Sequence, residues 1–200
     1  MEEIFKILKN ESLTYDELLD LYITYLKNIK REVPNYKEDY EYYKNNYLYL
    51  NCYAYSLGLN IPKEFNEYFY KLINSYFIFY PGVFSKKGVP KGNEIIDYTL
   101  EDIELLNIKG YRIAIMLERM YKGSNLDFHY ARENTDHSWS SKLGRSSCIV
   151  KNNYVEVPSD YDIIKVLKIW IIIWKKIYFC VIIYLSVLVA QLEEQLPPKQ

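Results

Sequence analysis

The stretch "GYRIAIMLERM", residues 110–120, decides the fold class of this chain. Its side chains alternate between two sets, one with Tyr111, Ile113, Ile115 and Leu117 and the other with Arg112, Ala114, Met116 and Glu118. A period of two is typical of a β-strand, whereas apolar residues in the N-terminal third recur at helical spacing. The sequence therefore predicts an α+β fold, in which N-terminal helices precede an antiparallel sheet.

Two more strands are predicted directly after this stretch. They lie in "LDFHYAREN" (residues 126–134) and "SWSSKLG" (138–144), and "NTDH" (134–137) forms the turn between them. A further strand is predicted in "NYVEV" (153–157). Adjacent hairpins of this kind make an antiparallel meander.

The pairing across this turn decides which side chains share a face of the sheet. Closing the hairpin so that Glu133 pairs with Ser138 leaves His129 outside the core among polar groups. The residues expected on the face of His129 are Ser138, Ser140 and Lys142, and those expected on the core side are Phe128, Trp139 and Leu143.

Upstream of the sheet, the sequence predicts several helices. Thr14 and Glu17 form a capping-box pattern that begins one helix, and Pro34 ends it. A second helix is expected over about residues 37–49, and a short one is expected to begin at Thr99.

The segment "NCYAYSLG", residues 51–58, predicts a helix of about two turns. Asn51 is a favoured N-cap, and Gly58 suits the position just past a helix end. Cys52 would then be the first helical residue. A thiolate benefits from that position, because the unpaired N–H groups and the dipole of a helix start lower the pKa of a thiol.

Composition excludes several classes of protein. The chain has 200 residues, 26% of them charged, and a net charge of −1, which favours one globular domain and no binding to nucleic acid. The three cysteines are widely spaced without a CxxC motif, so neither a disulfide framework nor a metal site is expected, and no cofactor is implied. The start "MEEIFKILKNES" lacks the apolar core of a signal peptide, and the expected location is cytoplasmic.

The C-terminal tail, residues 166–200, differs from the domain expected over residues 1–165. Its apolar run is broken by lysines, and the uninterrupted part, residues 177–190, is shorter than the roughly 20 residues that span a bilayer. Three interpretations stay open: a buried or interfacial helix, a membrane anchor over about residues 166–192, or a non-native read-through. The last is favoured by "VAQLEEQLPPKQ", which resembles a translated tRNA gene.

Cys52 and His129 are the residues that carry the candidate chemistry. An imidazole within hydrogen-bond reach of a thiol lowers the thiol pKa further and accepts its proton. A nucleophilic cysteine at a helix start, followed in sequence by a histidine on a strand, is the order of papain-like hydrolases. The alternative is structural, with Cys52 a small buried residue and His129 an ordinary strand residue.

Two segments resemble the motifs of a known family. "NCYAYSLG" (residues 51–58) resembles "NCYAYALG", and "DFHYARENTDHSWSSKLGRSS" (127–147) resembles "DFHFYRxDxDGxWSxKxG". Both motifs belong to bacterial and phage proteins of uncertain function, a family that looks like a divergent branch of the NlpC/P60 and papain-like cysteine hydrolases. This chain departs from the pattern at His137, where the family has glycine, and at Ser141, where many relatives have histidine.

The resemblance implies a papain-like fold, with a Cys–His core over about residues 47–150, and a set of site residues. Cys52 would be the nucleophile and His129 the general base. The third catalytic group, which would orient the imidazole of His129, is assigned to Ser140 because of the face of the sheet predicted for that residue. The backbone N–H of Cys52 would be one oxyanion donor. Asn46 and Asn51 are the candidate substrate-binding residues.

The expected activity is that of a thiol hydrolase, acting on a peptide or peptidoglycan-like amide through a Cys52 thioester. Two alternatives remain. The same fold without catalysis would be an interaction module that binds a partner through the tyrosine-rich face of the helix at residues 37–49. A small membrane-attached protein, held by its apolar tail, is the other.

Overall fold

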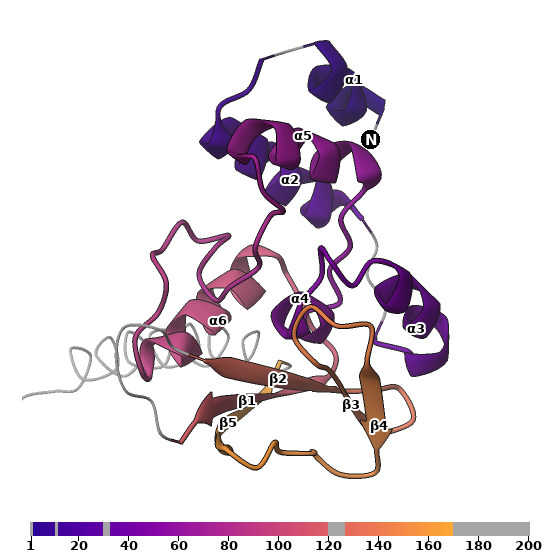
Figure 1. The fold of residues 1–200 in the computed structure, drawn as a ribbon, viewed down its shortest axis with the longest axis vertical. Coiled ribbons are helices and arrows are strands. Elements are labelled where there is room, and N and C mark those ends of the chain that lie inside the picture. Colours follow the sequence, from indigo (N-terminus) through magenta and orange to yellow (C-terminus); the bar gives the residue numbers. More distant parts are fainter. Residues whose placement is uncertain (1, 11, 30–32, 120–126, 170–200) are drawn as a thin grey trace, which may run out of the picture. The chain divides into compact units, whose positions relative to one another are not determined.

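A computed structural model of the chain describes residues 2–10, 12–29, 33–119 and 127–169 (Figure 1). In this part of the chain, helices come first and strands follow, so the predicted α+β class is confirmed. The helices are α1 (Glu2–Asn10), α2 (Tyr15–Asn28), α3 (Tyr36–Asn45), α4 (Cys52–Ser56), α5 (Lys63–Ile73) and α6 (Glu94–Leu105). The strands are β1 (Arg112–Glu118), β2 (Phe128–Glu133), β3 (Trp139–Lys142), β4 (Ile149–Asn152) and β5 (Tyr161–Lys168).

The strands form one antiparallel sheet in the order β4-β3-β2-β1-β5. The predicted meander of three strands is therefore present as β1, β2 and β3. The strand predicted at residues 153–157 is wrong, because the pairing strands on either side are β4 and β5. Residues 166–168, taken from sequence as the start of an apolar tail, belong to β5, which pairs with β1 at the edge of the sheet.

The compact unit that contains the sheet extends to Ile169. The expectations for the rest of the tail fall on residues 170–200, outside the described part of the chain. Among the described residues, no helix combines the length and the hydropathy that crossing a bilayer requires.

The register of the β2–β3 hairpin differs by one residue from the predicted one. Glu133 pairs with Trp139, not with Ser138. The reason is a three-residue connection: the N–H of Asn134 donates to the Ser138 carbonyl at 2.8 Å, and His137 adopts a left-handed φ of 62°. Because side chains alternate along a strand, this shift moves every residue of β3 to the face opposite the predicted one.

One face of the sheet is covered by helices. Tyr53 of α4 packs edge-on against Tyr130 of β2, with ring centroids 5.1 Å apart. Tyr55, also of α4, donates its hydroxyl to the Ser140 Oγ of β3 at 2.7 Å. Thr99 of α6 lies 2.6 Å from the Tyr130 hydroxyl. The inner face is therefore the face of Tyr130 and Ser140.

The outer face of the sheet holds a second, smaller core. Its buried members are Ala114, Met116, Ala131 and Trp139. The chain between β4 and β5 crosses this face, and Val155 and Tyr161 pack against the four residues. Trp139 is buried as predicted, but it lies on the opposite face from Phe128, contrary to the prediction.

Two helix starts test the capping signals. The capping box of Thr14 and Glu17 is present at the start of α2, as predicted. Thr99 does not begin a helix: α6 starts five residues earlier, and the Thr99 hydroxyl donates to the Ile95 carbonyl at 2.6 Å. A threonine inside a helix commonly bonds the carbonyl four residues back, and such a residue imitates a cap in the sequence.

Candidate functional site

Cys52 is the first residue of α4, where the sequence predicts it. The side chain of Asn51 caps the helix: its Oδ1 accepts the N–H of Ala54 at 3.0 Å. Its Nδ2 donates to the Phe79 carbonyl. Both the oxygen and the nitrogen of the Asn51 amide therefore form hydrogen bonds within the protein, and these bonds position Cys52.

The thiol of Cys52 lies against the edge of β2. Its Sγ is 3.8 Å from the Phe128 carbonyl oxygen, and the N–H of Tyr130 also points toward the sulfur. β2 pairs with β3 only from Ala131 onward, so these two backbone groups have no partner on a neighbouring strand. The thiol occupies the place of that missing partner.

Burial dominates the ionisation of this thiol. Cys52 is 4% exposed, and burial raises its pKa to about 12. The Tyr130 N–H and the Lys142 ammonium oppose the shift without cancelling it. The activation expected from a helix start is therefore outweighed, and the resting sulfur is a neutral thiol at neutral pH.

His129 lies between the two residues whose backbone groups contact the sulfur, but its side chain is on the other face of the sheet. The neighbouring Phe128 and Tyr130 share the inner face, so alternation places His129 on the outer one. There its ring lies 6.3 Å from that of Tyr161, centroid to centroid. The Cys52 thiol therefore lies against the backbone on both sides of His129. The imidazole of His129, however, lies on the outer face of the sheet, whereas α4 lies on the inner face.

The imidazole of His129 is buried and has an unpaired nitrogen. The residue is 5% exposed, and its Nε2 has no hydrogen-bond partner within the described residues. Burial lowers the pKa of His129, and nearby Asp127 opposes that shift. His129 is accordingly a neutral base at neutral pH, with an unsatisfied buried polar atom that a fully structural residue would be expected to pair.

Ser140 is not beside His129, and the prediction of a shared face is wrong. Its Oγ accepts the Tyr55 hydroxyl on the inner face and donates to the Asn134 Oδ1 at 3.0 Å. The cause is the one-residue register shift described above. Ser140 links α4 to β3, so its contacts are with the helix that carries the thiol.

Asn46 has a capping role in the structure. It is the C-cap of α3, and its Nδ2 donates to the Tyr42 carbonyl at 2.8 Å. Its own carbonyl accepts the N–H of Leu50 at 3.2 Å. These contacts engage the side chain that the sequence assigns to substrate binding.

Lys142 is the residue that sequence reasoning did not assign to the site. The same register shift puts it on the inner face, where its side chain is fully buried and electrostatically coupled to Cys52. Its Nζ donates to the Gly144 carbonyl at 2.6 Å. Burial lowers the pKa of this ammonium to about 8. Recognising the three-residue turn in the sequence would have placed Lys142 correctly.

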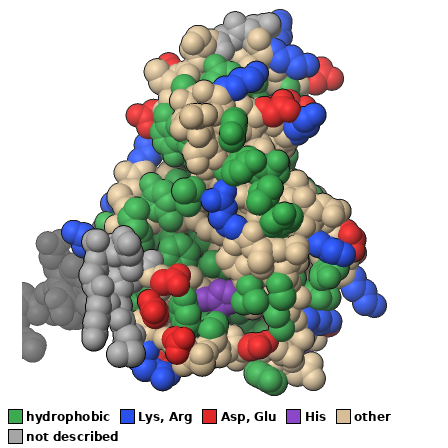
Figure 2. Space-filling model, in the orientation of Figure 1, with side chains coloured by type: hydrophobic (Ala, Val, Ile, Leu, Met, Phe, Trp, Pro, Cys, Tyr) green, Lys and Arg blue, Asp and Glu red, His purple; other side chains and the backbone are tan. Residues whose placement is uncertain are grey.

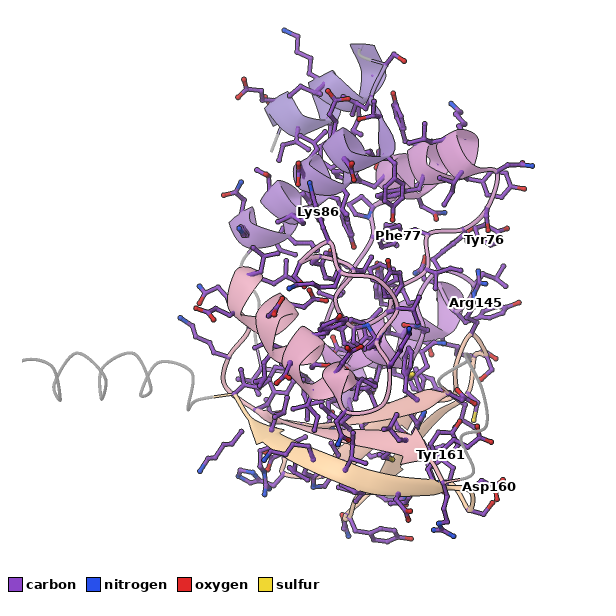
Figure 3. The ribbon with its side chains drawn as sticks, turned by 90° about the vertical axis from the view of Figure 1, so that its left-hand side faces the viewer. Tyr76, Phe77, Lys86, Arg145, Asp160 and Tyr161 are labelled. Atoms are coloured by element: carbon purple, nitrogen blue, oxygen red, sulfur yellow. The ribbon has the colours of Figure 1, made fainter. Side chains whose placement is uncertain are left out.

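On the outer face, Tyr161 connects the site to an acidic surface. Its hydroxyl donates to the Asp127 Oδ2. Burial and that carboxylate raise the pKa of Tyr161. Figure 3 labels Tyr161, the first residue of β5, and the preceding Asp160. Figure 2 shows acidic side chains gathered beside a histidine. No group of histidine, cysteine and acidic residues suited to a metal ion occurs in the described part of the chain.

Comparison with family models, with curated proteins and with solved structures found no match. The resemblance to NlpC/P60 and papain-like hydrolases therefore stays a prediction from the two motifs.

Proposed function

We propose that the protein is a thiol hydrolase that cleaves a peptide or peptidoglycan-like amide through a Cys52 acyl-enzyme, with His129 as the base. The observation that supports it is the position of the sulfur. Two residues 77 positions apart in sequence converge, because the Cys52 Sγ contacts the backbone on both sides of His129. The unpaired, buried Nε2 of His129 is the second supporting feature.

The proposal makes a specific demand on the start of β2. Cys52 and His129 are both neutral at rest, so the proton has to leave the sulfur during attack and not before it. Direct transfer to His129 needs the imidazole to reach the sulfur around the unpaired edge of β2. Because Cys52 is only 4% exposed, a substrate can reach the sulfur only if that edge opens, so the proposal requires such an opening.

The test is the rate at which iodoacetamide alkylates Cys52 as a function of pH, in a chain with Cys148→Ser and Cys180→Ser. The proposal expects alkylation of the folded protein that slows when His129 is replaced by alanine. His137→Ala is the matched control, because that imidazole is exposed in the turn after β2. A Cys52 that reacts only on unfolding, or equally fast in both variants, would contradict His129 as its base.

The second candidate function is an interaction module on the same fold. It is favoured by a partly exposed aromatic cluster, in which Arg145 lies 5.6 Å above the ring of Tyr76 and Tyr76 contacts Tyr49 and Tyr70 (Figure 3). In this reading the thiol only completes the edge of β2. A Cys52→Ser variant would then keep every cellular property of the wild type, whereas the hydrolase would lose its activity.

A further inference from the structure

β5 is an edge strand of the sheet. It stands last in the order β4-β3-β2-β1-β5 and pairs with β1 along one side. Figure 3 shows this strand, which begins at the labelled Tyr161, along the rim of the sheet. Within the part of the chain that the structure describes, no strand pairs with its other side. Such an edge presents backbone N–H and C=O groups that template the pairing of a further strand.

The two edges of the sheet are not equivalent. Proteins protect a sheet edge by keeping the strand short or by placing a helix against it. β4 has four residues, and its Lys151 lies 5.2 Å from the ring centroid of Tyr36 in α3. β5 has eight residues, and its Ile163 and Val166 are 42% and 44% exposed. β5 is thus the longer edge, and it exposes two branched apolar side chains.

A bulge decides which side chains of β5 share a face. The pairing with β1 leaves one extra residue, Ile164, in β5. Asp162 and Lys165 are opposite residues of β1 that face inward, so both lie on the inner side. The residues of β5 that are opposite members of the outer core, or that pack against it, are Tyr161, Ile163 and Val166.

A second copy of β5 fits this edge. Two copies can run antiparallel about a two-fold axis at the centre of residues 161–166. Tyr161 then lies opposite Val166 of the partner subunit, and both are on the outer side. Asp162 lies opposite Lys165 of the partner subunit, and both are on the inner side. The bulge is what lets each pair share a face.

Charge selects this register. Opposite charges directly across an antiparallel pair stabilise it, and the symmetry makes the Asp162–Lys165 pair occur twice. Inside its own chain, Lys165 has no carboxylate within ion-pair distance among the described residues. Asp162 pairs with Arg119, but both side chains are 58% exposed, so the carboxylate remains open to a second cation. A neighbouring register that also matches the faces would set Asp162 opposite Leu167 and lose the charge pair.

We propose that β5 is a dimerisation strand, through which two copies of this chain join their sheets edge to edge. The inference goes beyond the hydrolase proposed above and does not depend on Cys52 or His129. A contact along a single strand lies at the low end of interface sizes. The dimer should therefore dissociate on dilution.

The experiment is sedimentation of the full-length chain over a range of concentrations. Lys165→Asp sets carboxylates opposite each other on both sides of the axis, and it should raise the dimer dissociation constant by about tenfold. The exchange Asp162→Lys with Lys165→Asp restores opposite charges and should recover most of the affinity. Lys168→Asp is the matched control, because it makes the same change of charge beyond residues 161–166 and should have little effect.

A wild-type chain that stays monomeric would overturn the inference, and so would a dimer that Lys165→Asp leaves intact or that the exchange does not restore. A monomer whose β5 amides resist hydrogen exchange as strongly as those of β1 would overturn it by showing that the same chain covers the edge.

If the charge variants fail to fold, cross-linking tests the same register. Ile163→Cys is made in the chain with Cys148→Ser and Cys180→Ser, because residue 163 lies beside its own copy across the axis. Mild oxidation should join two copies by a disulfide, whereas Lys168→Cys should not be cross-linked. Equal cross-linking at the two positions would refute the proposed pairing.

Discussion

At the scale of single residues, a few side chains join the sheet and its neighbouring loops to the helices. The Cys52 thiol completes the open edge of β2, and the amide of Asn51 joins a helix start to the Phe79 carbonyl. Arg132 is fully buried, stacks 3.8 Å above the ring of Tyr55 and pairs with Asp39. Each of these residues links the sheet or its neighbouring loops to the helices on the inner face.

His137 is a residue whose conformation disfavours its own type. Its φ of 62° is left-handed, a region that glycine enters without the roughly 1–2 kcal/mol that a Cβ adds. We expect His137→Gly to raise the free energy of unfolding by about 1 kcal/mol, measured by urea denaturation at pH 8.

His137→Ala serves as the control for that change. It removes the same imidazole, which is exposed and lies 3.2 Å from Glu133, but it keeps the Cβ. If the glycine variant is no more stable than the alanine variant, the left-handed backbone at His137 is not a source of strain.

At the scale of elements, Asp102 fixes the loop between α5 and α6. This buried carboxylate accepts the Tyr53 hydroxyl of α4, the N–H of Gly82, and both the N–H and the hydroxyl of Ser85. A single side chain of α6 thereby holds α4 and the loop in register. The segment that carries Cys52 is positioned by these contacts as well as by its cap.

Asp102→Asn should destabilise the fold by about 2–3 kcal/mol, because one carboxylate oxygen becomes an NH₂ that faces donors. Thermal and urea unfolding measure the loss. A control at Asp97, an exposed residue of the same helix, should change stability by less than about 0.5 kcal/mol. Equal effects at the two positions would contradict the role of Asp102.

The difference in stability between the wild type and Asp102→Asn should also depend on pH. Burial raises the pKa of Asp102 in the folded state above its value in the unfolded chain. The stability that the protonated form contributes is present below the unfolded pKa and is lost as pH rises through the raised pKa. The wild type should therefore lose stability relative to Asp102→Asn across that interval, in unfolding curves recorded from pH 3 to 7. A gap between the two proteins that does not change with pH would rule this out.

The sequence predicted elements well where one local signal decides them. The capping box at Thr14, the cap at Asn51 and the alternation over residues 111–118 all formed as expected. The faces of β3 could not be predicted from alternation alone, because a single residue in the turn inverts them. That error assigned Ser140 and Lys142 to the wrong face of the sheet.

The position of Cys52 relative to His129 is decided by the tertiary structure. The family resemblance implied a shared site for Cys52 and His129, which requires the helix of the cysteine to meet the strand of the histidine, and α4 does contact β2. It could not show that the sulfur would sit on the edge of β2 with the imidazole on the far face. Nor does a cap reveal whether the following thiol is exposed, and burial controls its pKa.

At the scale of the whole molecule, the last described backbone hydrogen bond to the sheet comes from Ile169, whose N–H donates to the Tyr111 carbonyl at 3.2 Å. We expect a chain that ends at Ile169 to unfold cooperatively in a thermal scan. A chain that ends at Pro158 lacks β5 and should lose cooperative unfolding, because one edge of β1 and part of the outer core would be exposed. Failure of the first chain to fold would show that residues 170–200 are needed for stability.

The place of β5 in the sheet has a consequence for protein synthesis. β1 is made before β2, β3 and β4, yet its second edge is paired by β5, the last strand in the described part of the chain. While the polypeptide is still on the ribosome, that edge is bare, and a bare strand edge is a template for pairing with other nascent chains. Slow translation between β4 and β5 would prolong this exposure. Codon choice over residues 153–160 should therefore affect the yield of folded protein more than codon choice in the N-terminal helices.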